Sequence, residues 1–275
     1  MAFKLTQRKH APYPEPPPPV SWAKFEGLRL KTNDGQEIGG WFADGRSDAP
    51  TVLFLHGNGG GRKHCLGRAE ILAKELGCAL MLISLRAHGD STGDFNDIGL
   101  SARRDVVAAV DFLRDRRPGQ PVVVFGVSLG SAAAAFAGGE LGDDVDGYVL
   151  ESPYQDLTTA VRNRTRAALP TPFEQIAYAG LRFAGLFLLP QLDEIAPVKA
   201  VAAIPERVPI LIMSGEDDDL ATPAEAKAIF DQVRTHARLE SFPLAKHNNL
   251  AEVDPERYRR LIVGFTAGVH RPGGP

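Results

Sequence analysis

Residues 122–137 read VVVFGVSLGSAAAAFA. The run Val122–Phe125, three valines and a phenylalanine, predicts a buried strand, and the alanine-rich segment 132–137 favours a helix. A G-x-S-x-G motif therefore lies at a direct strand-to-helix turn, where Ser128 is expected in a strained conformation with its hydroxyl at the helix N-terminus. The two flanking glycines let strand and helix approach without clashes between Cβ atoms. This setting predicts that Ser128 is a nucleophile, against the alternative of an ordinary N-cap serine.

Short apolar runs of the same kind recur along the chain, each followed by a turn and a helical stretch, which is typical of βα units around a mostly parallel sheet. Asn33-Asp34-Gly35 is a hairpin turn between two further runs, so an antiparallel pair is expected to open the sheet. The sequence thus predicts an α/β fold with one sheet of about eight strands flanked by helices. The expected strands are Gly27–Thr32, Glu37–Phe42, Thr51–Leu55, Ala79–Leu85, Pro121–Gly126, Gly147–Glu151, Val208–Ser214 and Leu239–Phe242.

The regular alternation lapses between Ser152 and Pro205, and about fifty residues are too many for a bare connection in a compact domain. We expect this stretch to form a helical cap insertion over one end of the sheet. The predicted organisation has three parts. A proline-rich N-terminal arm takes residues 1–24, the core takes residues 25–151 and 206–270, and the cap insertion takes residues 152–205.

Composition limits the classes of protein. The chain has 275 residues, 44% of them hydrophobic and 24% charged, which indicates a folded domain rather than disorder. With 31 Lys+Arg and 34 Asp+Glu the net charge is −3, and no basic block suggests nucleic-acid binding. Cys65 and Cys78 could form one disulfide, but two small buried hydrophobic side chains are the favoured interpretation, because no metal or redox spacing is present.

The N-terminal arm lacks the apolar stretch of a signal peptide and has six prolines between Pro12 and Pro19. It is expected to be an extended, polyproline-like arm or spacer. We expect a cytoplasmic protein, but a spacer can also follow a membrane anchor, so membrane attachment stays open.

A serine nucleophile needs a base near neutral pH, and the chain has seven histidines. His247 follows the last predicted strand and precedes the last helix, where a loop can carry it back over the strand ends. We predict that His247 is the base rather than a solvated loop histidine. The other six lie in the arm, in turns, at helix ends or in the C-terminal tail: His10, His56, His64, His88, His236 and His270.

The imidazole in turn needs a carboxylate that orients it. Residues 214–219 (SGEDDD) follow a predicted strand, and Asp218 is our choice, with Asp219 next. Glu151, at the end of the preceding strand, is a weaker alternative. A solvated turn or a weak cation site is the other interpretation of this acidic run.

A developing oxyanion needs hydrogen-bond donors. Residues 53–61 (LFLHGNGGG) end a strand in a glycine-rich loop whose backbone N–H groups could supply one, and the N–H of Leu129 could supply another. Such a loop could instead cradle phosphate. The chain, however, has neither a G-x-x-x-x-G-K-[ST] motif nor a G-x-G-x-x-G motif followed by an acidic partner.

Five motifs together resemble the α/β-hydrolase fold family, over about residues 25–269. The similarity is greatest to the branch of carboxylesterases, lysophospholipase-like enzymes and serine-aminopeptidase-like hydrolases. In chain order the motifs are HGNGG (56–60), RAHGDSTG (86–93), GVSLGS (126–131), GEDDDLATP (215–223) and KHNNL (246–250).

The resemblance implies that Ser128 is the nucleophile, His247 the base, and Asn58 with Leu129 the source of the oxyanion N–H groups. Counting from the glycine that closes its strand implies Asp218 as the acid, whereas counting back from the proline implies Asp219. Because serine occupies the elbow, the resemblance does not favour the dehalogenases and epoxide hydrolases of the same family.

Residues 172–189 (PFEQIAYAGLRFAGLFLL), within the insertion, are apolar on nearly every side of a helical wheel. Such a helix must be buried or must contact lipid or a partner. A lid over an acyl-binding cleft is our favoured interpretation. Ordinary core packing, or a membrane or dimer surface, are the alternatives.

We therefore expect a serine esterase that cleaves small-molecule carboxylic esters of small to medium acyl chains through an acyl-enzyme, with no metal or organic cofactor and no nucleic-acid partner. A lysophospholipase- or lipase-like enzyme, or a serine-aminopeptidase-like enzyme, would use the same residues. A catalytically silent binding module is the alternative outside enzymes. Contact of the cap with a membrane or lipid surface is a further possibility, and the oligomeric state is not predicted.

Overall fold

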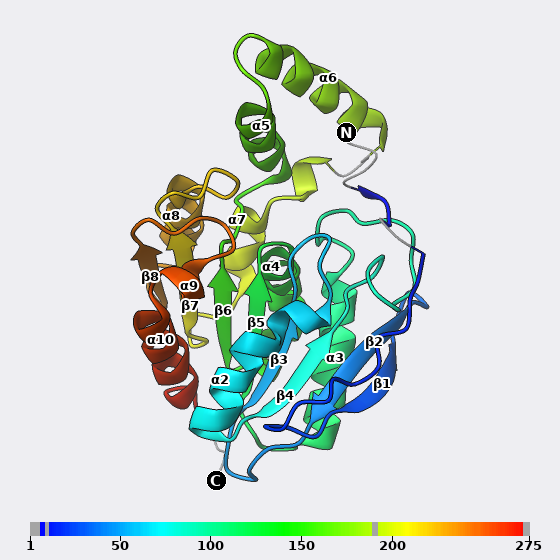
Figure 1. The fold of residues 1–275 in the computed structure, drawn as a ribbon, viewed down its shortest axis with the longest axis vertical. Helices are drawn as coiled ribbons and strands as arrows, with labels where there is room; N and C mark the ends of the chain where they lie inside the picture. Colours follow the sequence, from blue (N-terminus) through cyan, green and yellow to red (C-terminus); the bar gives the residue numbers. More distant parts are fainter. Residues whose placement is uncertain (1–5, 9–10, 189–191, 272–275) are drawn as a thin grey trace.

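One sheet of eight strands runs through the centre of the computed structural model, which describes residues 6–8, 11–188 and 192–271 (Figure 1). The strand order is β1-β2-β4-β3-β5-β6-β7-β8, with β1, β2 and β4 paired antiparallel and all other neighbours parallel. The predicted mostly parallel sheet, opened by an antiparallel hairpin, is confirmed. The strands are β1 Glu26–Lys31, β2 Glu37–Ala43, β3 Thr51–Leu55, β4 Ala79–Ile83, β5 Val122–Val127, β6 Gly147–Glu151, β7 Ile210–Gly215 and β8 Ala237–Phe242.

Helices cover both faces of the sheet, which is why its central strands are apolar throughout. In β3, Leu53 and Leu55 face one hydrophobic core, to which α3, α4 and α8 contribute. Val52 and Phe54 face the other core, together with α2 and α10 (Figure 1). These helices are α2 Leu66–Leu76, α3 Arg103–Arg116, α4 Leu129–Leu141, α8 Pro223–Gln232 and α10 Pro255–Ala267, with the short α9 Leu250–Val253 before α10.

The segment between β6 and β7 contains helices of its own, α5 Leu157–Ala168, α6 Phe173–Leu188 and the short α7 Pro197–Ala200. Asp156 caps α5 by accepting a hydrogen bond from the N–H of Thr159 (2.7 Å). In Figure 1, α5 and α6 lie beyond the carboxyl ends of the strands, with α6 outermost. Of the predicted cap and its apolar stretch, residues 189–191 lie outside the described part of the chain.

The N-terminal arm is bound to the core through its described residues, 6–8 and 11–24. The indole Nε1 of Trp41 donates to the carbonyl oxygen of Glu15 (2.9 Å), and the hydroxyl of Ser84 donates to the Glu15 carboxylate (2.5 Å). The guanidinium of Arg62 also donates to the Glu15 carbonyl (2.6 Å). Of the predicted arm or spacer, these residues form an arm that is bound to the core, and the spacer alternative does not hold for them. Positions 1–5 and 9–10, which include His10, lie outside the described residues.

Cys65 and Cys78 are both free and buried. Burial raises the pKa of each thiol to about 12, because the thiolate loses its hydration. The structure thus agrees with two small hydrophobic side chains and not with a disulfide. None of the helices in the described segments has the length and hydropathy needed to cross a membrane.

Candidate active site

Ser128 lies where β5 passes directly into α4, with backbone angles φ 52° and ψ −107°. A positive φ is strained for a residue with a side chain. The packing of strand against helix imposes it, because a Cβ on Gly126 would lie 2.4 Å from the backbone of Gly130. A Cβ on Gly130 would lie 2.3 Å from the carbonyl oxygen of Leu55. Only glycine fits at these two positions, so the turn is tight and presents the Ser128 side chain at the end of the sheet.

His247 lies beside Ser128, in the loop between β8 and α9. Its Nε2 is 2.9 Å from the Ser128 Oγ, although the two residues are 119 positions apart in the chain. The Ser152 hydroxyl donates to the carbonyl oxygen of His247 (2.9 Å) and so ties this loop to the end of β6. The structure brings together the predicted nucleophile and the predicted base.

Asp218 lies on the other side of the imidazole, with its Oδ2 2.7 Å from Nδ1 of His247. Its Oδ1 accepts hydrogen bonds from the backbone N–H groups of Leu220 (2.8 Å) and Ala221 (2.9 Å), which fix the orientation of the carboxylate. An ionised carboxylate only accepts hydrogen bonds, so Nδ1 of His247 carries the proton and Nε2 is free to accept the serine proton. This line of hydrogen bonds is what base activation of a serine requires.

The two other candidate acids do not face His247. Asp219 is exposed, whereas Asp218 is 2% exposed. Glu151 is buried, and its carboxylate is hydrogen-bonded to the guanidinium of Arg68 (2.9 Å from Nε) and to the hydroxyl of Tyr258 (2.6 Å). In the described part of the chain, no group of three or more His, Cys, Asp or Glu side chains is placed to hold a metal ion.

Asn58 and Leu129 line the same pocket as Ser128. Leu129 is the first residue of α4, so its backbone N–H has no acceptor within the helix. Among the described residues, no backbone acceptor is found for the N–H of Asn58 either. The side chain of Asn58 is held by Asn96, whose Nδ2 donates to its Oδ1 (3.0 Å). Two backbone donors thus remain available beside the serine, at the positions predicted for an oxyanion site.

His56 and His88 support the glycine-rich loop that carries Asn58. Their rings meet edge to face at 4.9 Å between centroids. His56 Nε2 accepts from the N–H of Leu85 (3.0 Å), and His88 Nε2 accepts from the N–H of Gly59 (3.1 Å). Burial, with a smaller contribution from His88, lowers the pKa of His56 to about 3, so this ring is neutral. Both histidines occur in the motifs of the sequence, but their supporting role was not predicted.

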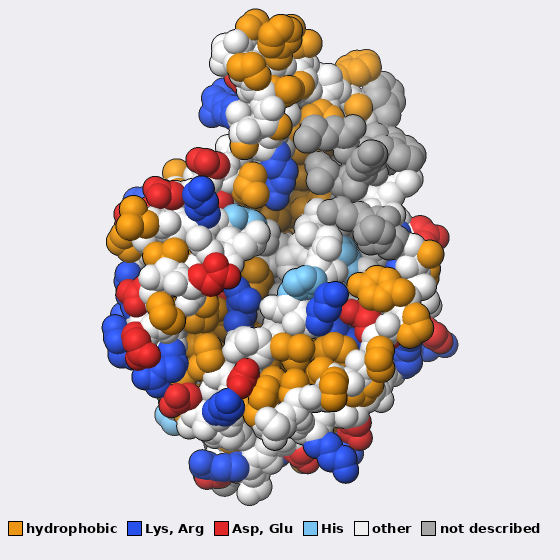
Figure 2. All heavy atoms as spheres, viewed as in Figure 1, with side chains coloured by type: hydrophobic (Ala, Val, Ile, Leu, Met, Phe, Trp, Pro, Cys, Tyr) orange, Lys and Arg blue, Asp and Glu red, His pale blue; other side chains and the backbone are white. Residues whose placement is uncertain are grey.

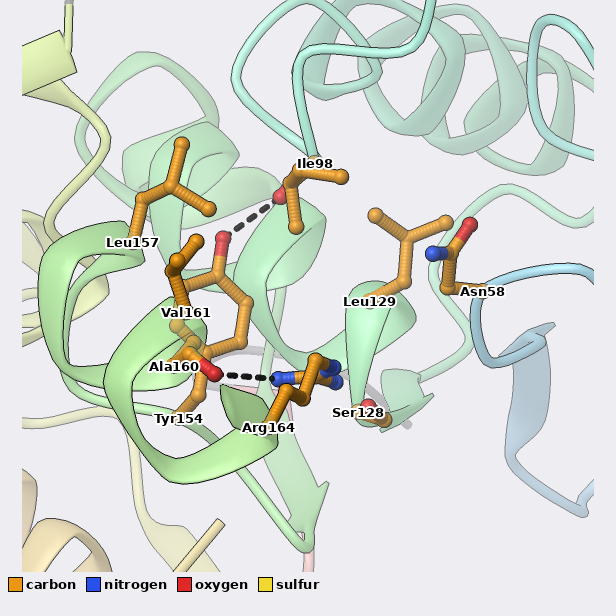
Figure 3. Close-up of a pocket in the computed structure, with 9 residues that line it drawn as sticks. All are labelled: Asn58, Ile98, Ser128, Leu129, Tyr154, Leu157, Ala160, Val161 and Arg164. Atoms are coloured by element: carbon orange, nitrogen blue, oxygen red, sulfur yellow. Dashed lines mark hydrogen bonds between the residues drawn. The ribbon is translucent and has the colours of Figure 1, made fainter. Parts of the chain in front are cut away.

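The wall of the pocket opposite Ser128 comes from the insertion, through Tyr154 and helix α5 (Figure 3). The hydroxyl of Tyr154 donates to the carbonyl oxygen of Ile98 (2.6 Å), a pocket residue that itself has a positive φ of 56°. Helix α5 contributes one cation, Arg164, which sequence analysis did not single out. The remaining residues of this wall are apolar: Leu157, Ala160 and Val161.

The chain is similar to several known proteins. Protein bem46 of Schizosaccharomyces pombe is 26% identical over 272 residues, which cover 97% of this chain and 83% of that protein. Lysophosphatidylserine lipase ABHD12 of Rattus norvegicus is 27% identical over 192 residues, 65% of this chain but only 44% of that protein. The structure of the Pyrococcus furiosus esterase Pf2001 has the same fold, with a TM-score of 0.75 at 20% identity, and the match covers 94% of this chain and 97% of that one. A model of the Alpha/beta hydrolase family matches residues 52–261, most of the chain. The chain therefore belongs to the Alpha/beta hydrolase family, as its motifs predicted.

Proposed function

We propose that the protein is a serine hydrolase that cleaves carboxylic esters of small to medium acyl chains through an acyl-enzyme intermediate. The observation that carries the proposal is the unbroken line of hydrogen bonds from Ser128 through His247 to Asp218. The family is one of hydrolases, which supports the same class of reaction.

In the first half of the proposed reaction, the Ser128 Oγ attacks the ester carbonyl carbon while Nε2 of His247 accepts the hydroxyl proton. Asp218 stabilises the imidazolium that forms. The carbonyl oxygen becomes an oxyanion, and the backbone N–H groups of Asn58 and Leu129 donate to it. When the intermediate collapses, the bond to the leaving oxygen breaks and His247 returns the proton to that oxygen. Acyl-Ser128 and a free alcohol result.

In the second half, water takes the place of the serine hydroxyl. His247 accepts a proton from the water as its oxygen attacks the acyl carbon, the same two N–H groups hold the oxyanion, and the proton passes to the Ser128 Oγ as the acyl bond breaks. A carboxylic acid leaves and the serine is restored. Apart from the attacking water, these steps use only the side chains and backbone groups already described.

The test is Ser128→Ala, assayed with p-nitrophenyl esters of increasing acyl length and with a fluorophosphonate label. We expect both turnover and labelling to be lost. Ser131→Ala is the matched control, because Ser131 lies on the same turn but its hydroxyl donates to the carbonyl oxygens of Gly126 (2.7 Å) and Glu151 (2.9 Å). Undiminished turnover in Ser128→Ala would contradict the proposal. Failure of the wild type on a broad ester panel and with the label would instead favour a binding module.

A lysophospholipase-like activity is the second candidate, and the outer face of α6 favours it. Phe173, Ile176 and Phe183 follow one another at helical spacing and are 62%, 68% and 65% exposed. Figure 2 shows hydrophobic side chains gathered at this end of the molecule. An exposed apolar face of this kind suits contact with a lipid surface.

This second candidate predicts that turnover of lysophospholipid rises steeply once the substrate forms micelles. Replacing Ile176 and Phe183 together by serine should then lower the ratio of micellar to monomeric turnover. If the ratio does not change in the double variant, α6 does not contact the lipid surface. Aminoacyl arylamides, measured beside the ester series, separate a serine-aminopeptidase-like activity from both candidates.

A further inference from the structure

Arg164 places a positive charge beside the candidate nucleophile. It belongs to α5 and lines the same pocket as Ser128, Asn58 and Leu129. Figure 3 shows its side chain extending from α5 toward Ser128, across a wall that is otherwise apolar. A ligand whose carbonyl carbon lies at the Ser128 hydroxyl would therefore lie close to this guanidinium.

Arg164 is partly buried and has no ion pair among the described residues, in contrast to Arg62, Arg68 and Arg86. In the described part of the chain no carboxylate lies within 4.0 Å of it, and its one protein acceptor is the carbonyl oxygen of Ala160, 3.1 Å from Nη1. Its other N–H donors are not sealed in the protein interior, since none of its nitrogens is both buried and unbonded. The paired arginines are Arg62 with Asp90, Arg68 with Glu151, and Arg86 with Asp34 and Asp105.

The acids that act on this charge are engaged elsewhere. Asp218 is hydrogen-bonded to His247, and Glu225 accepts from the N–H of Thr222 (2.8 Å) and from Nδ2 of Asn163 (2.6 Å). Burial is the main influence on Arg164 and lowers the pKa of its guanidinium from the ordinary value. A partly buried cation without a counterion gains more from a ligand anion than a fully solvated one does, and a guanidinium fits carboxylate and phosphate in a bidentate manner.

We propose that Arg164 binds an anionic group of the substrate, so that the enzyme selects esters carrying a carboxylate or phosphate near the scissile bond. This inference rests on the proposed ester hydrolysis and names the class of ester. The apolar residues Leu157, Ala160 and Val161 contact the carbon chain that links the two groups. Arg164 determines specificity, whereas the bond-breaking steps remain with Ser128 and its hydrogen-bonded partners.

The experiment compares two matched pairs of substrates at low ionic strength, each scored as the ratio of kcat/KM for the anionic to the neutral member. The first pair is mono-p-nitrophenyl glutarate and its methyl ester, which places a carboxylate on the acyl side. The second is 1-butanoylglycerol 3-phosphate and 1-butanoylglycerol, which places a phosphate on the alcohol side. We expect the wild-type ratio to exceed ten in one pair and to fall as NaCl is added.

In Arg164→Gln that ratio should fall at least tenfold, and Arg164→Lys, which keeps the charge but not the bidentate geometry, should lie between. Arg166→Gln, on the exposed side of the same helix, should leave the ratio and the basal activity unchanged. If Arg164→Gln does not fold, the wild-type ratios and their dependence on NaCl test the preference for anionic esters. Ratios of one or below in both pairs, or equal losses for both members of each pair in Arg164→Gln, would overturn the inference. Turnover of the neutral esters and labelling of Ser128 test the hydrolase itself separately.

Discussion

Acidification should destabilise the fold through His56, which lies under the candidate oxyanion loop. His56 is 1% exposed, and burial lowers its pKa from 6.5 to about 3. Between these two values the unfolded chain binds a proton that the folded chain excludes, so the free energy of unfolding falls as the pH falls below 6.5. The sign follows from the direction of the shift, because the unfolded state binds more protons in this range.

The magnitude follows from the same two pKa values. Each pH unit below the unfolded pKa of 6.5 costs about 1.4 kcal/mol for as long as the folded ring stays neutral. From pH 7 to pH 5 the free energy of unfolding should therefore fall by about 2 kcal/mol through His56 alone. This is a sizeable fraction of the about 5–15 kcal/mol that stabilises an ordinary domain.

The assay is urea unfolding followed by circular dichroism at pH 7, 6 and 5, in the wild type and in His56→Gln. Glutamine keeps an acceptor for the N–H of Leu85 but does not titrate, so the variant should lose about 2 kcal/mol less than the wild type over this range. His236, whose pKa burial also lowers, contributes to both proteins and cancels in the comparison. Equal pH dependence in the two proteins would refute the reasoning, whatever their absolute stabilities.

Two further predictions concern the site and the elbow. Asp218→Asn should lower kcat for an ester by about 10³-fold or more, because an amide no longer stabilises the imidazolium. Asp219→Asn, at an exposed position, should keep a kcat near that of the wild type. Equal losses of kcat in the two variants, measured in steady-state assays, would contradict this. Gly130→Ala should lower the free energy of unfolding by about 3 kcal/mol, because its Cβ would lie 2.3 Å from the Leu55 backbone. Gly264→Ala, in open space on α10, should raise it by about 1 kcal/mol. Equal stability of the two variants in urea unfolding would argue against this explanation of the glycines.

The sheet was predictable because its central strands are buried on both faces and appear in the sequence as continuous apolar runs. The bounds of the edge strand β8 were predicted less well. Leu239–Phe242 was expected, whereas β8 is Ala237–Phe242 and includes Arg238 and Glu240, which are only partly buried or exposed. An edge strand has one solvated side, so charged residues interrupt the apolar pattern that identifies the inner strands.

The docked arm was not predictable from composition. Its prolines indicate an extended chain, but they carry no N–H groups, so the sequence shows no hydrogen bonds that would attach it. Attachment depends on Glu15, which is bonded to Trp41, Arg62 and Ser84. It also depends on Arg8, whose guanidinium donates to the carbonyl oxygens of Gly89 and Gly93. These partners come together only in the folded core. A spacer and a bound arm have the same local signature.

The geometry around Ser128 and His247 was predictable because each follows its own strand, and parallel strands bring their carboxyl ends to one edge of the sheet. The acid was ambiguous by one position, since four acids follow one another in residues 216–219. Burial separates them in the structure. Asp218 turns inward and is bonded to two backbone N–H groups, while Asp219 remains exposed. Residue spacing in the sequence does not show which of the two aspartates is buried.

The position of Arg164 in the pocket could not be predicted from the sequence, for a different reason. The residues around Ser128 are fixed by backbone constraints, such as the contact between Gly130 and β3, and such constraints leave glycines in the sequence. Arg164 is fixed by the way α5 lies over the strand ends, and an arginine within an amphipathic helix looks the same whether it faces solvent or a pocket. The core sequence thus determines where Ser128 and His247 lie, whereas the docking of α5 determines that Arg164 lines the same pocket. If the proposed role of Arg164 holds, a substitution in α5 should change which esters are cleaved while Ser128, His247 and Asp218 stay the same.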